Sequence, residues 1–187
     1  MKKIFLFFVL LMLCPATLFA QASTSEHSSK EANFRVQTLA PWSQMTIEKK
    51  NLEKSPGWLV KFHKEGELSA SAPFALYIVD GRKNEDIKQT SADFERGHAN
   101  FILFQIVEAE KMKGPSEELT LKDSEIKKYG EKSFIYLEYE RLGLKVYRVM
   151  TALNNYTYAF NCQITSLDDG EAIKANLELM MKSLSKY

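Results

Sequence analysis

The chain has 187 residues, of which 45% are hydrophobic and 12% aromatic, and its 25 basic and 24 acidic side chains nearly cancel. This length is sufficient for one domain with a substantial buried core. Without a basic excess there is no electrostatic case for binding nucleic acid or an anionic membrane surface.

The N-terminus has the pattern of a secretory signal peptide. Lys2 and Lys3 precede the apolar run Ile4–Leu13, and Pro15 follows that run. A membrane-spanning helix needs roughly 20 apolar residues, so this run is short for a permanent anchor. We expect export to the periplasm, or secretion, with no stable membrane anchor after processing.

Small residues mark the expected cleavage point, which we place after Ala22, with Ala20 as the alternative. Cleavage removes two lysines and leaves 23 basic and 24 acidic side chains, a net charge of −1. It also removes Cys14, and the large Leu13 before that cysteine argues against processing as a lipoprotein. Cys162 is then the only cysteine, so an intramolecular disulfide is excluded.

After the cleavage point the sequence predicts a flexible leader and then a series of strands. The segment Ser23–Ala32 is polar and has no apolar periodicity, so His27 within it is expected to be solvated. Three short runs rich in β-branched and aromatic residues, bounded by Pro or Gly, predict strands at Phe34–Trp42, Trp58–His63 and Phe74–Asp80.

The pattern changes to that of a helix over Ser91–Lys113. Phe94, Phe101 and Phe104 recur there at helical spacing. Gly97 disfavours a helix by about 1 kcal/mol relative to Ala, and the segment FILFQIV alone is also compatible with a strand.

From residue 119 onward the apolar period becomes two. Ser133–Glu140 and Lys145–Leu153 both alternate and are joined across Gly143. Asn154 and Asn155 then predict a tight hairpin turn, because Asn tolerates positive φ. An antiparallel meander is therefore expected.

The next strand, Tyr156–Ile164, contains Cys162. Alternation places Cys162 on the same face as Tyr156, Tyr158 and Phe160. A reactive thiol needs an electropositive, partly exposed setting, which its sequence neighbours do not supply. We interpret Cys162 as a core residue rather than a nucleophile.

The chain ends in a predicted amphipathic helix that begins at an Asp168 cap, with Glu171 three residues later. Its apolar stripe is interpreted as packing against the sheet rather than as a ligand groove. The stripe consists of Ile173, Leu177, Met180, Met181 and Leu184.

The order of these segments resembles the PsbP-like family over nearly all of residues 33–187. The resemblance rests on APW, the helix DFERGHANFILF, the meander KKYGEKSFIYLEYE, the strand YTYAFNCQI and the closing MKSL. It implies an α+β fold, an α/β/α sandwich in which an antiparallel sheet of about six to seven strands is flanked by a central helix and a C-terminal helix.

The resemblance extends to exported bacterial DcrB-like members. Proteins of this family are binding or assembly proteins: an extrinsic subunit of the oxygen-evolving complex, a nuclear-import factor that binds a small GTPase, and chaperones that sheath hydrophobic helices of secreted toxins. The resemblance therefore implies another protein, here of the cell envelope, as partner. It carries over no partner-binding residue, because the matching motifs are loose apolar patterns.

Residues with catalytic or metal-binding potential are scattered. His27, His63 and His98 have no second His or Cys at ligand spacing. Glu95 and His98 are three residues apart, which is the spacing found in one half of a di-iron site. The second half would require another such pair, which the sequence lacks, so a solvated helix face is favoured. Common hydrolase, nucleotide and zinc motifs are also absent. We assign no catalytic, cofactor-binding or metal residues and expect no enzyme activity.

Two hypotheses remain. The first is a non-catalytic envelope protein that binds another protein or protects an apolar segment, recognisable by an exposed apolar patch. The second is a small-ligand-binding protein or an unrecognised enzyme. It would require a concave pocket with converging polar groups such as Tyr136, Glu138, Tyr147 or Arg148.

Overall fold

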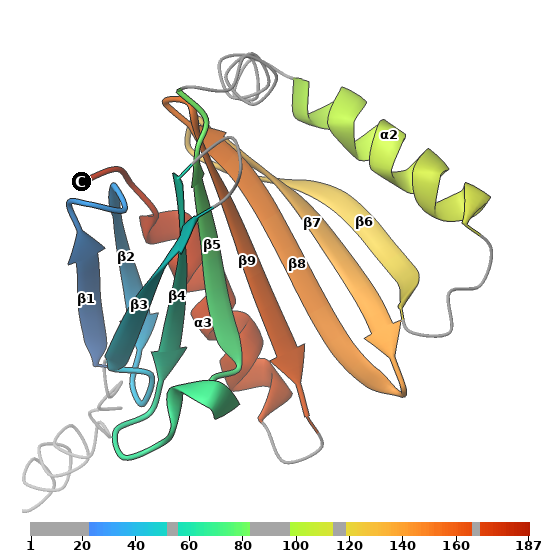
Figure 1. Ribbon diagram of the computed structural model, residues 1–187. Coiled ribbons are helices and arrows are strands. Elements are labelled where there is room, and N and C mark those ends of the chain that lie inside the picture. Colours follow the sequence, from blue (N-terminus) through green and yellow to red (C-terminus); the bar gives the residue numbers. More distant parts are fainter. Residues whose placement is uncertain (1–22, 52–55, 83–97, 114–118, 166–168) are drawn as a thin grey trace, which may run out of the picture.

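The computed structural model describes residues 23–51, 56–82, 98–113, 119–165 and 169–187 (Figure 1). The described part contains a two-stranded and a seven-stranded sheet, both antiparallel, two α-helices and the short 3-10 helix η1 (Ser69–Ser71). The seven strands lie in the order β3-β4-β5-β9-β8-β7-β6. The strand bounds are β1 Thr24–Ser29, β2 Phe34–Leu39, β3 Gln44–Asn51, β4 Pro56–His63, β5 Phe74–Asp80, β6 Thr120–Tyr129, β7 Lys132–Arg141, β8 Leu144–Leu153 and β9 Tyr156–Ile164.

The two helices cover opposite faces of the large sheet. Helix α3 (Gly170–Ser183) and the β1–β2 hairpin lie on one face, behind the sheet in Figure 1, and α3 contacts β2 and β9. Helix α2 (Ala99–Met112) packs on β6 and β7 from the other face. The predicted α/β/α sandwich with a seven-stranded antiparallel sheet is confirmed, and the separate β1–β2 sheet is an addition to it.

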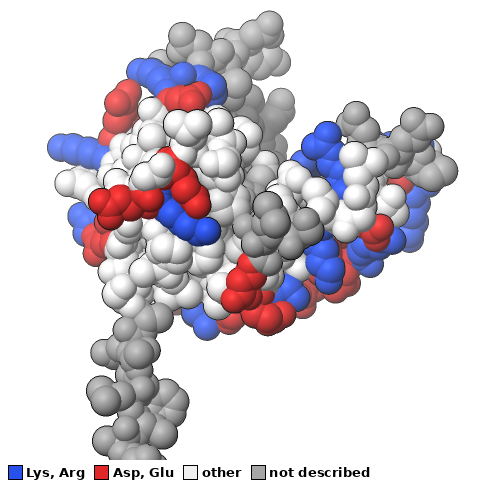
Figure 2. All heavy atoms as spheres, turned by 90° about the horizontal axis from the view of Figure 1, so that it is seen from below, with Lys and Arg blue, Asp and Glu red and all other residues white. Residues whose placement is uncertain are grey.

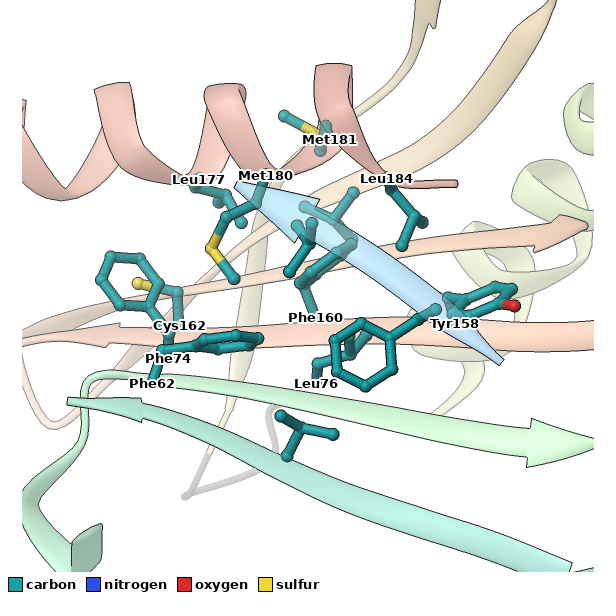
Figure 3. Packing of buried hydrophobic residues seen from close by; sticks show 14 of the residues in the cluster. Phe62, Phe74, Leu76, Tyr158, Phe160, Cys162, Leu177, Met180, Met181 and Leu184 are labelled. Atoms are coloured by element: carbon teal, nitrogen blue, oxygen red, sulfur yellow. The ribbon is translucent and has the colours of Figure 1, made fainter. Parts of the chain in front are cut away.

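The main core lies between the large sheet and α3. In β9 the alternate residues from Tyr156 to Cys162 are buried, as the period of two predicts, and Cys162 is only 1% exposed. Figure 3 shows Cys162 next to Phe62, Phe74 and Met180. Burial among apolar side chains confirms the interpretation of Cys162 as a core residue. All five residues of the predicted apolar stripe on α3 are likewise buried.

A smaller core lies under α2. It contains Ile135, Leu137 and Tyr139, which alternate along β7 with Phe134 and Tyr136 of the main core. From the helix, Ile102, Leu103 and Ile106 pack against it while remaining partly exposed, and Ala99 is the buried residue of α2. Helix α2 is therefore less deeply buried against the sheet than helix α3.

The prediction of a flexible leader at Ser23–Ala32 is wrong. Residues Thr24–Ser29 form β1, which pairs along its length with β2. His27 is buried rather than solvated: its Nε2 lies 2.9 Å from Thr38 Oγ1 and its ring packs on the edge of Phe62. A polar strand of this kind is stabilised by pairing with its neighbouring strand, so its sequence shows no alternation of apolar and polar residues.

Other boundaries also differ from the predictions. Strand β2 ends at Leu39, short of Trp42, and β3 was not predicted because its sequence, QMTIEKKN, is mostly polar. The N-cap of α3 is Asp169, whose side chain accepts hydrogen bonds from the backbone nitrogens of Glu171 and Ala172, and not Asp168, which lies outside the described residues.

The helix predicted over Ser91–Lys113 is present from Ala99 to Met112, so the alternative of a strand at FILFQIV is excluded. Residues 83–97, with Phe94, Glu95 and Gly97, lie outside the described residues, as do the predicted signal peptide 1–22 and its cleavage point at Ala22 or Ala20. Among the described residues, no helix has the length and apolar character that crossing a membrane requires.

The last two hairpins of the meander, β7–β8 and β8–β9, both have two residues at positive φ in the turn but differ in sequence. Asn154 and Asn155 have φ of 49° and 65°, which confirms the predicted turn. Leu142 and Gly143 have φ of 51° and 77° in the preceding hairpin. Leucine at positive φ is unusual because its Cβ crowds the backbone there.

Candidate binding surfaces

The polar residues predicted to converge on the meander are split between the two faces of the sheet. Tyr136 and Tyr147 lie on the α3 face, with ring centroids 5.6 Å apart, and Glu138 is paired with Tyr147 across the strands. Arg148 lies on the α2 face, where its Nε donates to Asn161 Oδ1 at 3.1 Å. Three of the four residues are thus brought together and Arg148 is not.

A pocket of about 300 Å³ lies between α3 and the β6–β7 edge of the sheet. Its volume is at the lower end of the range for small-molecule sites. It combines apolar and charged side chains: Lys127, Tyr136, Glu171, Lys174, Ala175, Leu177, Glu178 and Met181. Of the four polar residues named from the sequence as a converging group, Tyr136 is the one that lines this pocket.

Three lysine–tyrosine contacts line the seam between α3 and the sheet. The closest places Lys127 Nζ 3.8 Å from the centroid of the Tyr136 ring. The other two join Lys174 to Tyr147 at 5.8 Å and Lys182 to Tyr129 at 5.6 Å. Each ammonium lies within the range of a cation–π interaction. The pairs of Lys174 with Tyr147 and of Lys182 with Tyr129 could not be found from sequence spacing, because their members are far apart in the chain.

Burial and neighbouring charges perturb the ionisable groups around this pocket. Burial raises the pKa of the Tyr136 and Tyr147 hydroxyls, and nearby carboxylates including Glu138 raise both further. The hydrogen bond from Lys182 lowers the pKa of Glu178. At neutral pH the tyrosines are therefore neutral and Glu178 is ionised.

A second pocket, of about 480 Å³, lies beside η1. It is lined by short and solvated side chains, among them Ala70, Ser71, Pro73 and Gln163. Its charged groups, Lys64 and Glu67, pair with each other at 3.5 Å. This pocket has no aromatic floor, so it offers less to a ligand than the pocket beside α3.

The outer face of α2 exposes large apolar side chains. Phe101 and Phe104 are 53% and 62% exposed, and Met112 further along the helix is 85% exposed. Spacings of three and four residues place Phe101, Phe104, Glu108 and Met112 on one side of the helix. The periodicity of the phenylalanines predicted the helix correctly, but these two face away from the core.

The sheet is incompletely covered on the α2 side. Helix α2 packs on β6 and β7, whereas Tyr77 in β5 is 41% exposed on the same side. Tyr77 pairs with Leu59 and with Ala159 of the adjacent strands. Within the described residues, this leaves the Tyr77 side chain partly exposed beside α2, although the neighbouring Leu59 is buried.

Charged side chains are dispersed over the surface. Figure 2 shows acidic and basic residues interspersed on the face it presents. In the described part of the chain, no group of three or more His, Cys, Asp and Glu side chains is arranged to hold a metal ion. His63 Nδ1 contacts Lys64 O at 3.2 Å, and the His98 ring lies 5.4 Å from that of Phe101.

Both edges of the large sheet carry charged residues. On β6, Lys127 pairs with Glu125 at 3.2 Å, and on β3, Lys50 pairs with Glu48 at 2.7 Å. Charges along an edge strand oppose the addition of a further strand. The apolar outer face of α2 and the pocket beside α3 are therefore stronger candidates for binding than the sheet edges.

No protein-family model matches the sequence, and no curated protein matches it either. Among solved structures, the chain is similar to cyanobacterial PsbP (CyanoP) from Synechocystis sp. PCC 6803, with a TM-score of 0.50 and 13% identity over 89% of this chain and 94% of that chain.

Two further structures are similar at lower scores. A Bacteroides thetaiotaomicron protein has a TM-score of 0.43 and 11% identity, covering 87% of this chain and 48% of that one. A Pseudomonas aeruginosa protein of unknown function, described as a putative regulator, has a TM-score of 0.39 and 14% identity, covering 87% and 96%. The likeness to CyanoP extends over nearly the whole of both chains, and this protein has a PsbP-like fold.

Proposed function

We propose that this protein is an exported, non-catalytic envelope protein of the DcrB-like kind, which binds another protein as an assembly or chaperone-like module. The observation that carries the proposal is the outer face of α2, where Phe101 and Phe104 are more than half exposed. Aromatic residues and methionine are enriched in protein–protein interfaces, and exposed apolar patches on a monomer mark such sites.

The contact surface is the outer face of α2 together with the exposed side chain of Tyr77. Both lie on the same side of the large sheet. The partner is a protein that offers an apolar segment, because the exposed groups of this surface are mainly aromatic and aliphatic. The charge pairs at the C-terminal end of α2, such as Lys111 with Glu108, lie at the rim of such a contact.

The test is photo-crosslinking in the native cell envelope, with a photoreactive residue at Gln105, which is exposed on α2. We expect one dominant crosslinked protein, identified by mass spectrometry. The double substitution Phe101→Ser and Phe104→Ser should abolish the crosslink. The control is Leu142→Ser, which removes an even more exposed apolar side chain, in a hairpin. A crosslink that survives the double substitution, or no crosslink at all, would contradict the proposal.

Export is tested separately by cell fractionation and by the mass of the mature chain. The proposal requires the protein in the periplasmic or secreted fraction. Its N-terminus should then follow Ala22, or Ala20 in the alternative. A chain of full mass in the cytoplasmic fraction would contradict export while leaving the interaction test unaffected.

A further inference from the structure

The pocket beside α3 lies on the face of the sheet opposite to α2, so a function there is independent of the protein-binding proposal. Its floor is apolar: the ring of Tyr136 comes from β7, and Leu177 and Met181, both buried, come from α3. Figure 3 shows Leu177 and Met181 in place on α3.

The rim of the pocket carries two ammonium and two carboxylate groups. Two of these four are already paired: Lys127 with Glu125 at 3.2 Å, and Glu178 with Lys182 at 2.8 Å. The remaining two are Glu171 and Lys174, three residues apart on α3. Neither makes an ion pair with any described residue, so one charge of each sign is available to a ligand.

Tyr147 packs beside two of the residues that line the pocket, without lining it itself. Tyr147 is fully buried, and its hydroxyl has no hydrogen-bond partner among the described residues. Its ring is 5.6 Å from that of Tyr136, and the Lys174 ammonium is 5.8 Å from its centroid. Tyr147 therefore contributes to the pocket through its contacts with Tyr136 and Lys174 rather than by lining it.

We propose that this pocket binds a small zwitterion with an apolar group, such as a free apolar amino acid. Lys174, with Lys127 nearby, binds the carboxylate, and Glu171 binds the ammonium group. The apolar group lies against Tyr136 and the floor. A simple anion would meet the uncompensated charge of Glu171, and a simple cation would meet that of Lys174. The volume of about 300 Å³ suits a molecule of this size.

The test is isothermal titration calorimetry of the purified protein with leucine, methionine and phenylalanine. Each is compared with its amide, which lacks the carboxylate, and with its N-acetyl derivative, which lacks the ammonium group. We expect saturable binding of at least one amino acid, and an affinity at least tenfold lower for both of its derivatives.

Two substitutions assign the contacts. Lys174→Gln should lower the affinity for the amino acid at least tenfold, so that the amino acid no longer binds more tightly than its amide. Glu171→Gln should remove the difference in affinity between the amino acid and its N-acetyl derivative. Both residues are exposed, so unchanged circular dichroism is expected for each variant. The controls Lys186→Gln and Glu65→Gln change exposed charges outside the pocket and should leave the affinity unchanged.

Several results would overturn the proposal. One is the absence of binding for all three amino acids at millimolar concentration. Another is equal affinity for an amino acid and either derivative, which would indicate a simple cation or anion site. The third is an affinity that neither Lys174→Gln nor Glu171→Gln alters. None of these results bears on the outer face of α2, so failure here is distinguishable from failure of the protein-binding proposal.

Discussion

Asn176 of α3 accepts a hydrogen bond through Oδ1 from the backbone nitrogen of Leu39 in β2, at 2.6 Å. About two helical turns further along, Ser183 Oγ accepts a hydrogen bond from the backbone nitrogen of Gln37 at 2.8 Å. An edge strand leaves every second backbone donor without a partner. Side chains of α3 therefore take the place of a neighbouring strand along the outer edge of β2.

Substitution of Asn176 should destabilise the fold. Asn176→Ala removes the acceptor for Leu39 N and leaves a buried donor unsatisfied, so we expect the free energy of unfolding to fall by about 1–3 kcal/mol. Urea denaturation measures this change. The control is Asn100→Ala at an exposed position of α2, which should stay within about 0.5 kcal/mol of the wild type. Equal effects of the two substitutions would show that the Asn176 bond contributes nothing.

The burial of His27 predicts a loss of stability in mild acid. Burial lowers the pKa of His27 below its ordinary value of 6.5, so the folded protein binds fewer protons there than the unfolded chain. The stabilising contribution is complete above about pH 6.5 and is lost as the pH falls through the lowered pKa. We expect the free energy of unfolding to decrease between roughly pH 7.5 and pH 5.5, a window above the range in which carboxylates titrate.

His27→Gln provides the comparison for this effect. Its amide can still donate to Thr38 Oγ1, whose own hydroxyl donates to Trp42 O at 2.6 Å. Because glutamine does not titrate, the variant should lose less stability than the wild type over the same pH interval. Parallel pH profiles for the two proteins would refute a role for His27.

The elements that periodicity predicted are those that bury one face. Strand β9 and helix α3 alternate or repeat apolar residues at a single period, because one side meets the core and the other meets water. Strand β1 does not follow this rule. Its buried residue is His27, whose partner is the hydroxyl of Thr38, and a polar pair of this kind leaves no apolar period.

The candidate sites could be predicted only in part. Tyr136 and Tyr147 were named with Glu138 and Arg148 as polar groups that a pocket would bring together, and these two tyrosines do lie side by side on consecutive strands of the meander. Lys174 comes from a helix that is distant in sequence, and its approach to Tyr147 depends on how α3 packs. The exposure of Phe104 could not be predicted from the sequence either. Helical spacing does not show which face of a helix points inward when apolar residues occur all round it.

The hairpin between β7 and β8 should be stabilised by a better turn residue. Leu142 adopts φ of 51°, where asparagine is favoured, and its side chain is 85% exposed, so little packing would be lost. We expect Leu142→Asn to raise the free energy of unfolding by about 0.5–1 kcal/mol. The reciprocal change Asn154→Leu, at φ of 49° in the next hairpin, should lower it by a similar amount. Thermal denaturation of both variants checks the prediction, and a destabilised Leu142→Asn would contradict it.

The contrast between two phenylalanines tests whether the outer face of α2 serves binding or folding. Phe160 is almost fully buried in the main core, and Phe160→Ala should lower the free energy of unfolding by about 3–5 kcal/mol. Phe104 is 62% exposed, so Phe104→Ser should change it by no more than about 0.5 kcal/mol. Denaturation of both variants gives these values. If Phe104→Ser lowered the free energy of unfolding about as much as Phe160→Ala, Phe104 would be a residue that stabilises the fold. That result would contradict the assignment of the outer face of α2 as an interaction surface.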